Sequence, residues 1–145
     1  MISPRSNSKL FLGEFFACLA QVLNGMRNLM RAAHRLAEVK EHNSIIRLWD
    51  YANQIAETIS EAISNIPVYP GKDFVVILKA LKMQILSLRG NAPSSSGHKA
   101  PPATMVLLQK VQAEFENTEA ALLVLEECTL RWMPVLDYLA GLKEE

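Results

Sequence analysis

Apolar residues recur at every third or fourth position along almost the whole chain, which is the spacing of one face of an α-helix. The longest case covers residues 104–140, where one stripe continues for about ten helical turns. Its members are Leu108, Val111, Phe115, Thr118, Leu122, Leu125, Thr129, Trp132, Leu136 and Leu139. A helix of this length needs partners along its whole apolar face, so we expect the rest of the chain to supply them.

Three earlier segments carry the same pattern. The first covers about residues 8–41 and the second about residues 45–65, where Pro67 stops the helix because proline cannot donate a backbone hydrogen bond. The third covers about residues 74–89 and follows Asp73, which we expect to cap it. This third segment is apolar most of the way round, which is typical of the least exposed helix of a bundle.

Four apolar helices with short first and second connections predict an all-α fold, an antiparallel up-down-up-down four-helix bundle. Pro134 lies inside the long last helix and is expected to kink it, because Leu136 and Leu139 continue the stripe beyond it. Residues 91–103 are rich in Pro, Ser and Gly and predict a flexible loop rather than a domain boundary, since neither half could bury its stripe alone. We therefore expect residues 1–145 to form one domain.

Composition narrows the class of function. The chain carries 15 basic and 15 acidic residues, so its formal net charge is zero and it lacks the overall basic field of most nucleic-acid-binding proteins. The charges are nevertheless uneven. Residues 74–113 hold five basic side chains and no acid, whereas residues 114–145 hold eight acids and two bases. Packing these two segments side by side would neutralise both without an external partner.

The cysteines and the hydropathy bear on the compartment. Cys18 and Cys128 lie far apart in apolar runs and make no disulfide framework, so an intracellular, cytoplasmic location is the default expectation. No run of about 18 uncharged apolar residues is present, so we expect no membrane-spanning helix. Residues 10–20 superficially resemble a secretory signal, but Gly13 and Glu14 interrupt the run.

Strong catalytic motifs are missing from the sequence. It has no glycine-rich phosphate loop, no Cys-x-x-Cys, no His-Glu-x-x-His and no nucleophile elbow, so we expect no cofactor and no metal. Arg27, Asn28 and His34 resemble the Arg-x(4–6)-His signature of HEPN-domain ribonucleases, which are also helical bundles. The resemblance implies RNA cleavage at a dimer interface, with His34 as acid or base. A HEPN-like ribonuclease or toxin–antitoxin partner is therefore the alternative function, although in that family the motif usually lies late in the bundle.

Two further readings of the same helix are weaker. The run from Ala33 to Leu36 resembles the start of a histidine-phosphotransfer motif, but Glu38 one turn later would repel a phosphate. Arg27, Arg31 and Arg35, spaced four apart, are candidates for an anionic surface. No aromatic residues are interleaved with these arginines, so a solvated face is favoured and nucleic acid is not the expected partner.

Apolar side chains are in excess where the first helix begins and the last helix ends. These two ends lie together in an antiparallel pair, and one stripe per helix does not use all their apolar residues. We expect the flanking residues to bind a protein partner or a second copy of the chain; they are Phe11, Phe16, Leu123, Met133 and Tyr138. The sequence thus predicts a non-catalytic helical-bundle interaction module of the scaffold or adaptor kind.

Overall fold

Four α-helices contain most of the residues that the structure describes. The computed structural model describes residues 4–38, 46–67, 73–92 and 102–134, without side chains for residues 4–9, 46 and 47. The helices are α1 (Pro4–Glu38), α2 (Ile46–Asn65), α3 (Phe74–Gly90) and α4 (Pro102–Arg131). Within these described ranges no strand occurs, so the predicted all-α class is confirmed.

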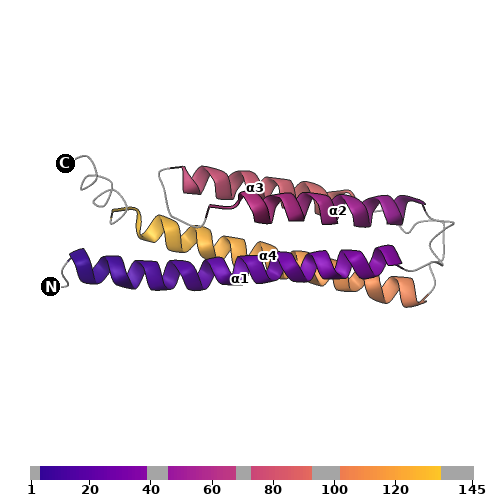
Figure 1. The fold of residues 1–145 in the computed structure, drawn as a ribbon, viewed down its shortest axis with the longest axis horizontal. Helices are drawn as coiled ribbons and strands as arrows, with labels where there is room; N and C mark the ends of the chain where they lie inside the picture. The colour runs from indigo at the N-terminus through magenta and orange to yellow at the C-terminus, as the bar shows by residue number, and fades with distance from the viewer. Residues whose placement is uncertain (1–3, 39–45, 68–72, 93–101, 135–145) are drawn as a thin grey trace.

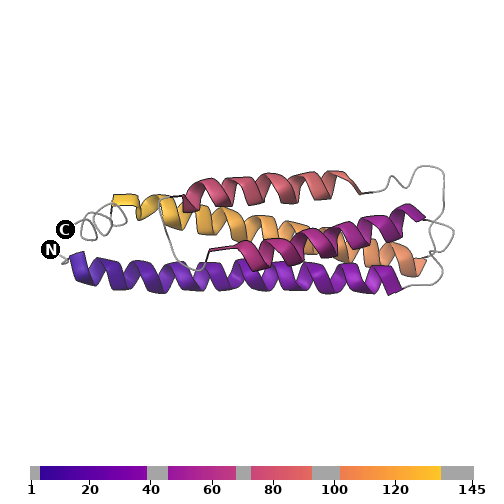
Figure 2. The same ribbon diagram turned by 45° about the horizontal axis from the view of Figure 1, so that its top comes forward.

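Successive helices run in opposite directions, with α1 and α3 pointing one way and α2 and α4 the other (Figure 1). The most extensive packing is between α1 and α4, followed by α1 with α2 and α3 with α4. Helix α3 makes little contact with α2, and the two ribbons diverge when the molecule is turned (Figure 2). The predicted antiparallel four-helix bundle is therefore present, and its weakest edge lies between α2 and α3.

The helices differ in length. Helices α1 and α4 have 35 and 30 residues, whereas α2 and α3 have 20 and 17. At 1.5 Å per residue the long pair spans about 52 and 45 Å and the short pair about 30 and 26 Å. The long α1–α4 pair is thus the spine of the bundle, and each short helix covers only part of it.

The predicted stripes of the two long helices form the core. Helix α1 buries Phe15, Leu19, Val22, Met26, Leu29, Ala33 and Leu36. Helix α4 buries Val111, Phe115, Thr118, Leu122, Leu125 and Thr129. The two threonines of α4 can lie in the core because each hydroxyl donates to a carbonyl one turn earlier: Thr118 to Glu114 and Thr129 to Leu125, both at 2.8 Å.

Helices α1 and α4 approach each other closely at Gly25. A Cβ atom at this position would lie 3.0 Å from Oγ1 of Thr118 and 3.4 Å from its Cα. Glycine inside a helix costs about 1 kcal/mol relative to alanine. Here the missing side chain allows the two backbones to pack at short range.

Two helices begin earlier than predicted. Helix α1 begins at Pro4 rather than near Ser8, and a proline in the first turn fits because its missing N–H has no helical acceptor there. Helix α4 begins at Pro102 for the same reason, two residues before the expected start at residue 104. Thr104 is a residue of the kind that often caps a helix, but here it is buried within the first turn.

The regular part of α4 ends at Arg131, and Met133 and Pro134 are helical again after a turn at Trp132. Proline removes one helical hydrogen bond, and its ring clashes with the carbonyl four residues earlier, which belongs to Leu130. The Trp132 N–H still donates to the carbonyl of Cys128 at 3.2 Å. The expected continuation over residues 135–140 lies outside the described residues, as does most of the expected loop at residues 91–103.

Helix α3 covers nearly the range that the sequence predicts, but its N-terminal cap differs from the expected one. Asp73 occupies the N-cap position without forming a side-chain cap hydrogen bond, although its carbonyl accepts from the Ile77 N–H at 3.0 Å. At the other end, the Asn91 N–H donates to the carbonyl of Leu88 at 3.1 Å. The boundaries are therefore fixed by backbone hydrogen bonds.

Candidate interaction surfaces

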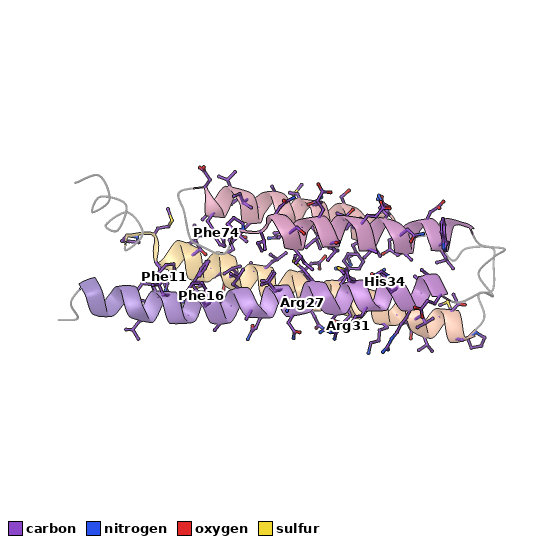
Figure 3. The ribbon with its side chains drawn as sticks, in the orientation of Figure 1. Phe11, Phe16, Arg27, Arg31, His34 and Phe74 are labelled. Atoms are coloured by element: carbon purple, nitrogen blue, oxygen red, sulfur yellow. The ribbon has the colours of Figure 1, made fainter. Side chains whose placement is uncertain are left out.

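An aromatic cluster fills the end of the bundle where α1 begins and α4 ends. The ring of Phe11 lies 5.6 Å from that of Phe15 and 5.7 Å from that of Trp132, measured between centroids. Phe74 at the start of α3 contacts Phe15 edge-on at 5.1 Å. The cluster therefore joins α1, α3 and α4 (Figure 3).

The expectation that Phe11 belongs to an exposed surface is wrong, because its side chain is fully buried. The spacing of Leu12, Phe15 and Leu19 predicts Leu12 as the core residue here, but the core position falls on Phe11 and Leu12 is only half-buried. Close packing on Trp132 of α4 explains this shift, because it turns the buried band of α1 toward α4 at this end. Substituting Phe11 would thus disturb the core.

A polar contact closes the same end of the α1–α4 pair. The carboxylate of Glu14 accepts a hydrogen bond from the indole N–H of Trp132 at 3.0 Å and forms an ion pair with Arg131. Because both partners lie at the end of α4, the contact fixes the register of the two long helices. It confirms that the start of the first helix lies beside the end of the last.

The other members of the predicted surface do not form one patch. Phe16 and Leu123 are 43% and 46% exposed, and Met133 is half-buried. Leu123 lies one turn after Glu119, which pairs with Arg89 of α3, so this side of α4 faces α3. Phe16 lies on α1 and packs on Phe15. Tyr138 lies outside the described residues.

Helix α3, which we expected to be the least exposed helix, exposes as many large apolar side chains as α4 does, although it is little more than half as long. Four large side chains of this helix reach solvent: Val76 at 66%, Met83 at 67%, Leu86 at 43% and Ile77 at 38%. The expectation fails because α3 packs mainly on α4, contacts α1 through Phe74, and hardly touches α2. We call Val76, Ile77 and Met83 the outer face of α3; Leu86 is nine residues after Ile77 and therefore lies on the opposite side of the helix.

A groove of about 290 Å³ lies between α2 and α3, where the two helices barely touch. Its residues on α2 are Glu61, Ala62, Asn65 and Ile66, and those on α3 are Ile77, Ala80, Leu81 and Gln84. Ile77 belongs both to the groove and to the outer face of α3. The groove and that face are therefore one continuous, largely apolar surface, which sequence periodicity could not place because it does not say how closely two helices pack.

A second groove of about 360 Å³ follows the α1–α4 contact and has a polar lining. Gln21, Asn24 and Asn28 line it from α1, with Asn117 and Glu114 opposite on α4. The close approach at Gly25 leaves these amide side chains at the rim of the helix pair. No cluster of titratable groups converges there among the described residues.

Helix α1 exposes its arginines toward the other end of the bundle (Figure 3). Arg27, Arg31, Arg35 and His34 are all exposed, and none forms an ion pair with a described carboxylate. Asn28 is half-buried in the groove beside α4. The structure thus brings Arg27 and His34 to one exposed face and turns Asn28 away from it.

A polar network ties α3 to α4 and borders α2. The Arg89 guanidinium donates to Glu119 at 2.7 Å and to Glu116 at 3.2 Å. This pairing is one instance of the neutralisation that the charge distribution predicted, since Arg89 is the one basic side chain of the segment that forms an ion pair within the described residues. The hydroxyl of Tyr51 is buried nearby beside Gln112 and has no hydrogen bond of normal geometry. Burial raises the pKa of Tyr51 to about 12, an effect that Gln112 and Arg89 partly oppose.

The two cysteines are free thiols. Burial raises the pKa of Cys128 to about 11, and the nearby Glu14 and Cys18 add to the shift. Cys18 is half-buried on α1 and Cys128 is buried on α4, the two helices that pack most extensively. In the described part of the chain, no three His, Cys, Asp or Glu side chains are grouped as metal ligands would be.

Comparison with known proteins gives no relative: no protein-family model, no curated protein and no solved structure matches the chain. None of the described helices is both long enough and apolar enough to cross a bilayer.

Proposed function

We propose that this chain is a non-catalytic protein-interaction module of the scaffold or adaptor kind, which binds a helix of another protein along α3. The observation that carries the proposal is the outer face of α3. Val76 and Met83 expose about two thirds of their surface although they lie on a helix of the bundle. Apolar side chains clustered at a surface are typical of interaction sites.

The neighbouring groove supports a helical partner. An amphipathic helix binds by placing side chains at positions i, i+3, i+4 and i+7 into an apolar groove. The α2–α3 groove runs between two helices, and its apolar lining includes Ile66, Ile77 and Leu81. Met83 adds a flexible side chain on the outer face of α3, of a kind that adapts to different partners. A partner helix lying here would supply the packing that α2 and α3 do not give each other.

The test compares two matched substitutions of exposed apolar residues. Met83→Glu changes the outer face of α3, whereas Val106→Glu changes α4 at a site that is 63% exposed. Each variant is used as bait in a native lysate beside the wild-type chain, and far-UV circular dichroism confirms its helical content. We expect one partner to be retained by the wild type and by Val106→Glu and lost by Met83→Glu. Retention of every partner by a folded Met83→Glu variant would refute the proposal.

The alternative is a HEPN-like ribonuclease or a toxin–antitoxin partner that uses Arg27, Asn28 and His34. One observation supports it, since Arg27 and His34 share an exposed face that a second copy could cover. Asn28 points into the α1–α4 groove, so the three groups do not converge within one chain. Incubation of structured RNA with the wild type and with His34→Ala tests it: cleavage lost in the variant would establish the alternative.

A further inference from the structure

We infer that the helix bound in the α2–α3 groove is basic, with lysine or arginine along the edge that faces α2. The inference rests on the proposed function and names the chemical class of the partner. It comes from the charges on the two walls of the groove, which differ between α2 and α3.

The α2 wall is acidic. Asp50, Gln54, Glu57 and Glu61 are spaced four, three and four residues apart, so they follow one face of the helix. Glu61 lines the groove itself, and Gln54 on the same face bonds to Asn91 beyond the end of α3, which shows that this face turns toward α3. No lysine or arginine occurs between Leu48 and Asn65.

These carboxylates have no partner within the described residues. The ion pairs found there use Glu116, Glu119 and Glu14, and none includes Asp50, Glu57 or Glu61. All three of the α2 carboxylates are exposed. A cation brought by another molecule could therefore reach them without displacing an internal pair.

The α3 wall is apolar and keeps its own cations away from the groove. Ile77 and Ala80 line the groove, and Val76 and Met83 continue the apolar surface outward. Lys82 lies seven residues before Arg89 and so shares its face, which pairs with α4. Lys79 lies three residues after Val76 and four before Met83, beside the outer face of α3, so neither lysine of α3 is among the residues that line the groove.

The complementary ligand is a helix with one apolar stripe and basic residues at one flank. Its stripe would pack on Ile66, Ile77 and Leu81, and its flank would lie along Glu57 and Glu61. A second copy of this chain does not offer such a helix in α1, although the outer face of α1 is basic. The apolar band of α1 is already buried in its own bundle.

The probes are two synthetic helical peptides of 17 residues, the length of α3. Both carry leucine at the same i, i+3, i+4 and i+7 positions; one has lysine at the flanking positions and the other has glutamate. Binding to the full chain is measured by fluorescence anisotropy at low and at high ionic strength. We expect the lysine peptide to bind about tenfold more tightly at low salt, and the difference to shrink as salt screens the exposed pairs.

Variants of the chain assign the effect to residues. Glu57→Gln with Glu61→Gln should remove the preference for the lysine peptide, whereas Glu127→Gln, an exposed acid of α4, should not. Ile77→Gln should weaken both peptides alike, because it removes apolar contact and leaves the charges unchanged. Circular dichroism confirms that each variant keeps its helical content.

The other outcomes separate this inference from the proposed function. If both peptides bind equally and Ile77→Gln weakens both, the basic partner is refuted and the interaction module stands. If neither peptide binds but light scattering shows a dimer that Ile77→Gln disrupts, the occupant is a second copy and the inference is wrong. If neither peptide binds and Ile77→Gln changes neither partner capture nor mass, both the inference and the proposed function fail.

Discussion

Replacing Gly25 by alanine tests the closest contact of the bundle. The added Cβ would meet Oγ1 of Thr118 at 3.0 Å, and this oxygen is held by its hydrogen bond to the Glu114 carbonyl at 2.8 Å. The hydroxyl therefore cannot rotate away without losing that bond. The alternative is for α1 and α4 to separate by a few tenths of an ångström along their shared core.

Two opposing effects determine the size of the change. Alanine gains about 0.8–1 kcal/mol over glycine in a helix interior. Inserting a methyl group into a tightly packed site costs about 1–3 kcal/mol. We expect Gly25→Ala to lower the free energy of unfolding by up to about 2 kcal/mol. Removing the obstructing hydroxyl with Thr118→Ala should reverse the sign, so that in this background Gly25→Ala raises the free energy of unfolding by up to about 1 kcal/mol.

Gly13 supplies the matched control, because it lies in the same helix and a Cβ there would meet no atom within 4 Å. Gly13→Ala should therefore stabilise the chain by about 1 kcal/mol. Urea titration followed by circular dichroism measures each variant, and an unchanged m-value shows that the stability itself has changed. If Gly25→Ala stabilises the wild-type chain as much as Gly13→Ala does, the close approach of α1 and α4 is wrong.

Three further predictions follow from the core and its buried groups. Phe11→Ala should lower the free energy of unfolding by about 3–5 kcal/mol because Phe11 is fully buried. Leu10→Ala, at a 56% exposed site, should change it by less than about 0.5 kcal/mol. Equal effects of the two substitutions would show that Phe11 is not a core residue. Arg89→Met should lower the free energy of unfolding, measured by urea titration, by about 2 kcal/mol, because it leaves the partly buried carboxylate of Glu119 without its cation. An unchanged free energy of unfolding would show that the Arg89–Glu119 pair does not stabilise the fold. The free energy of unfolding should fall as the pH rises from about 9 to about 12. The pKa of Cys128 is raised from 9.0 to about 11 and that of Tyr51 from 10.0 to about 12. In this pH range the folded state therefore holds protons that the unfolded state releases. Thermal melts should show a shallower decline for Tyr51→Phe, and an identical decline would contradict the assignment.

Much of this fold is predictable from helical periodicity, because the stripes of the two long helices are regular and face each other. The antiparallel pairing of α1 with α4 follows from chain order and short connections, and the contacts of Glu14 with Arg131 and Trp132 confirm it. The ends of the helices were predicted less well. Prolines such as Pro102 can begin a helix as readily as precede one, and periodicity does not distinguish the two.

The candidate surface could not be placed from the sequence, for two reasons. The choice between Phe11 and Leu12 as the core residue depends on which helices lie beside α1 at that end, and this depends on helix lengths and register together. The role of Gly25 was also hidden, because a glycine in a helical pattern looks like a weak position until the residue opposite it is known. In both cases the missing information is a contact between residues more than 90 apart in sequence.

The apolar composition of α3 fits two different positions in a bundle. A helix that is apolar all round can lie at the centre, or it can lie at an edge and receive a partner on its outside. Contacts at its two ends decide between them: Arg89 fixes one end to α4, and Phe74 fixes the other to Phe15 of α1. Helix α3 is therefore held against the long pair and not against α2. The bundle leaves Val76 and Met83 exposed. Burying their exposed parts under a partner helix would stabilise the complex by about 1–2 kcal/mol for each side chain.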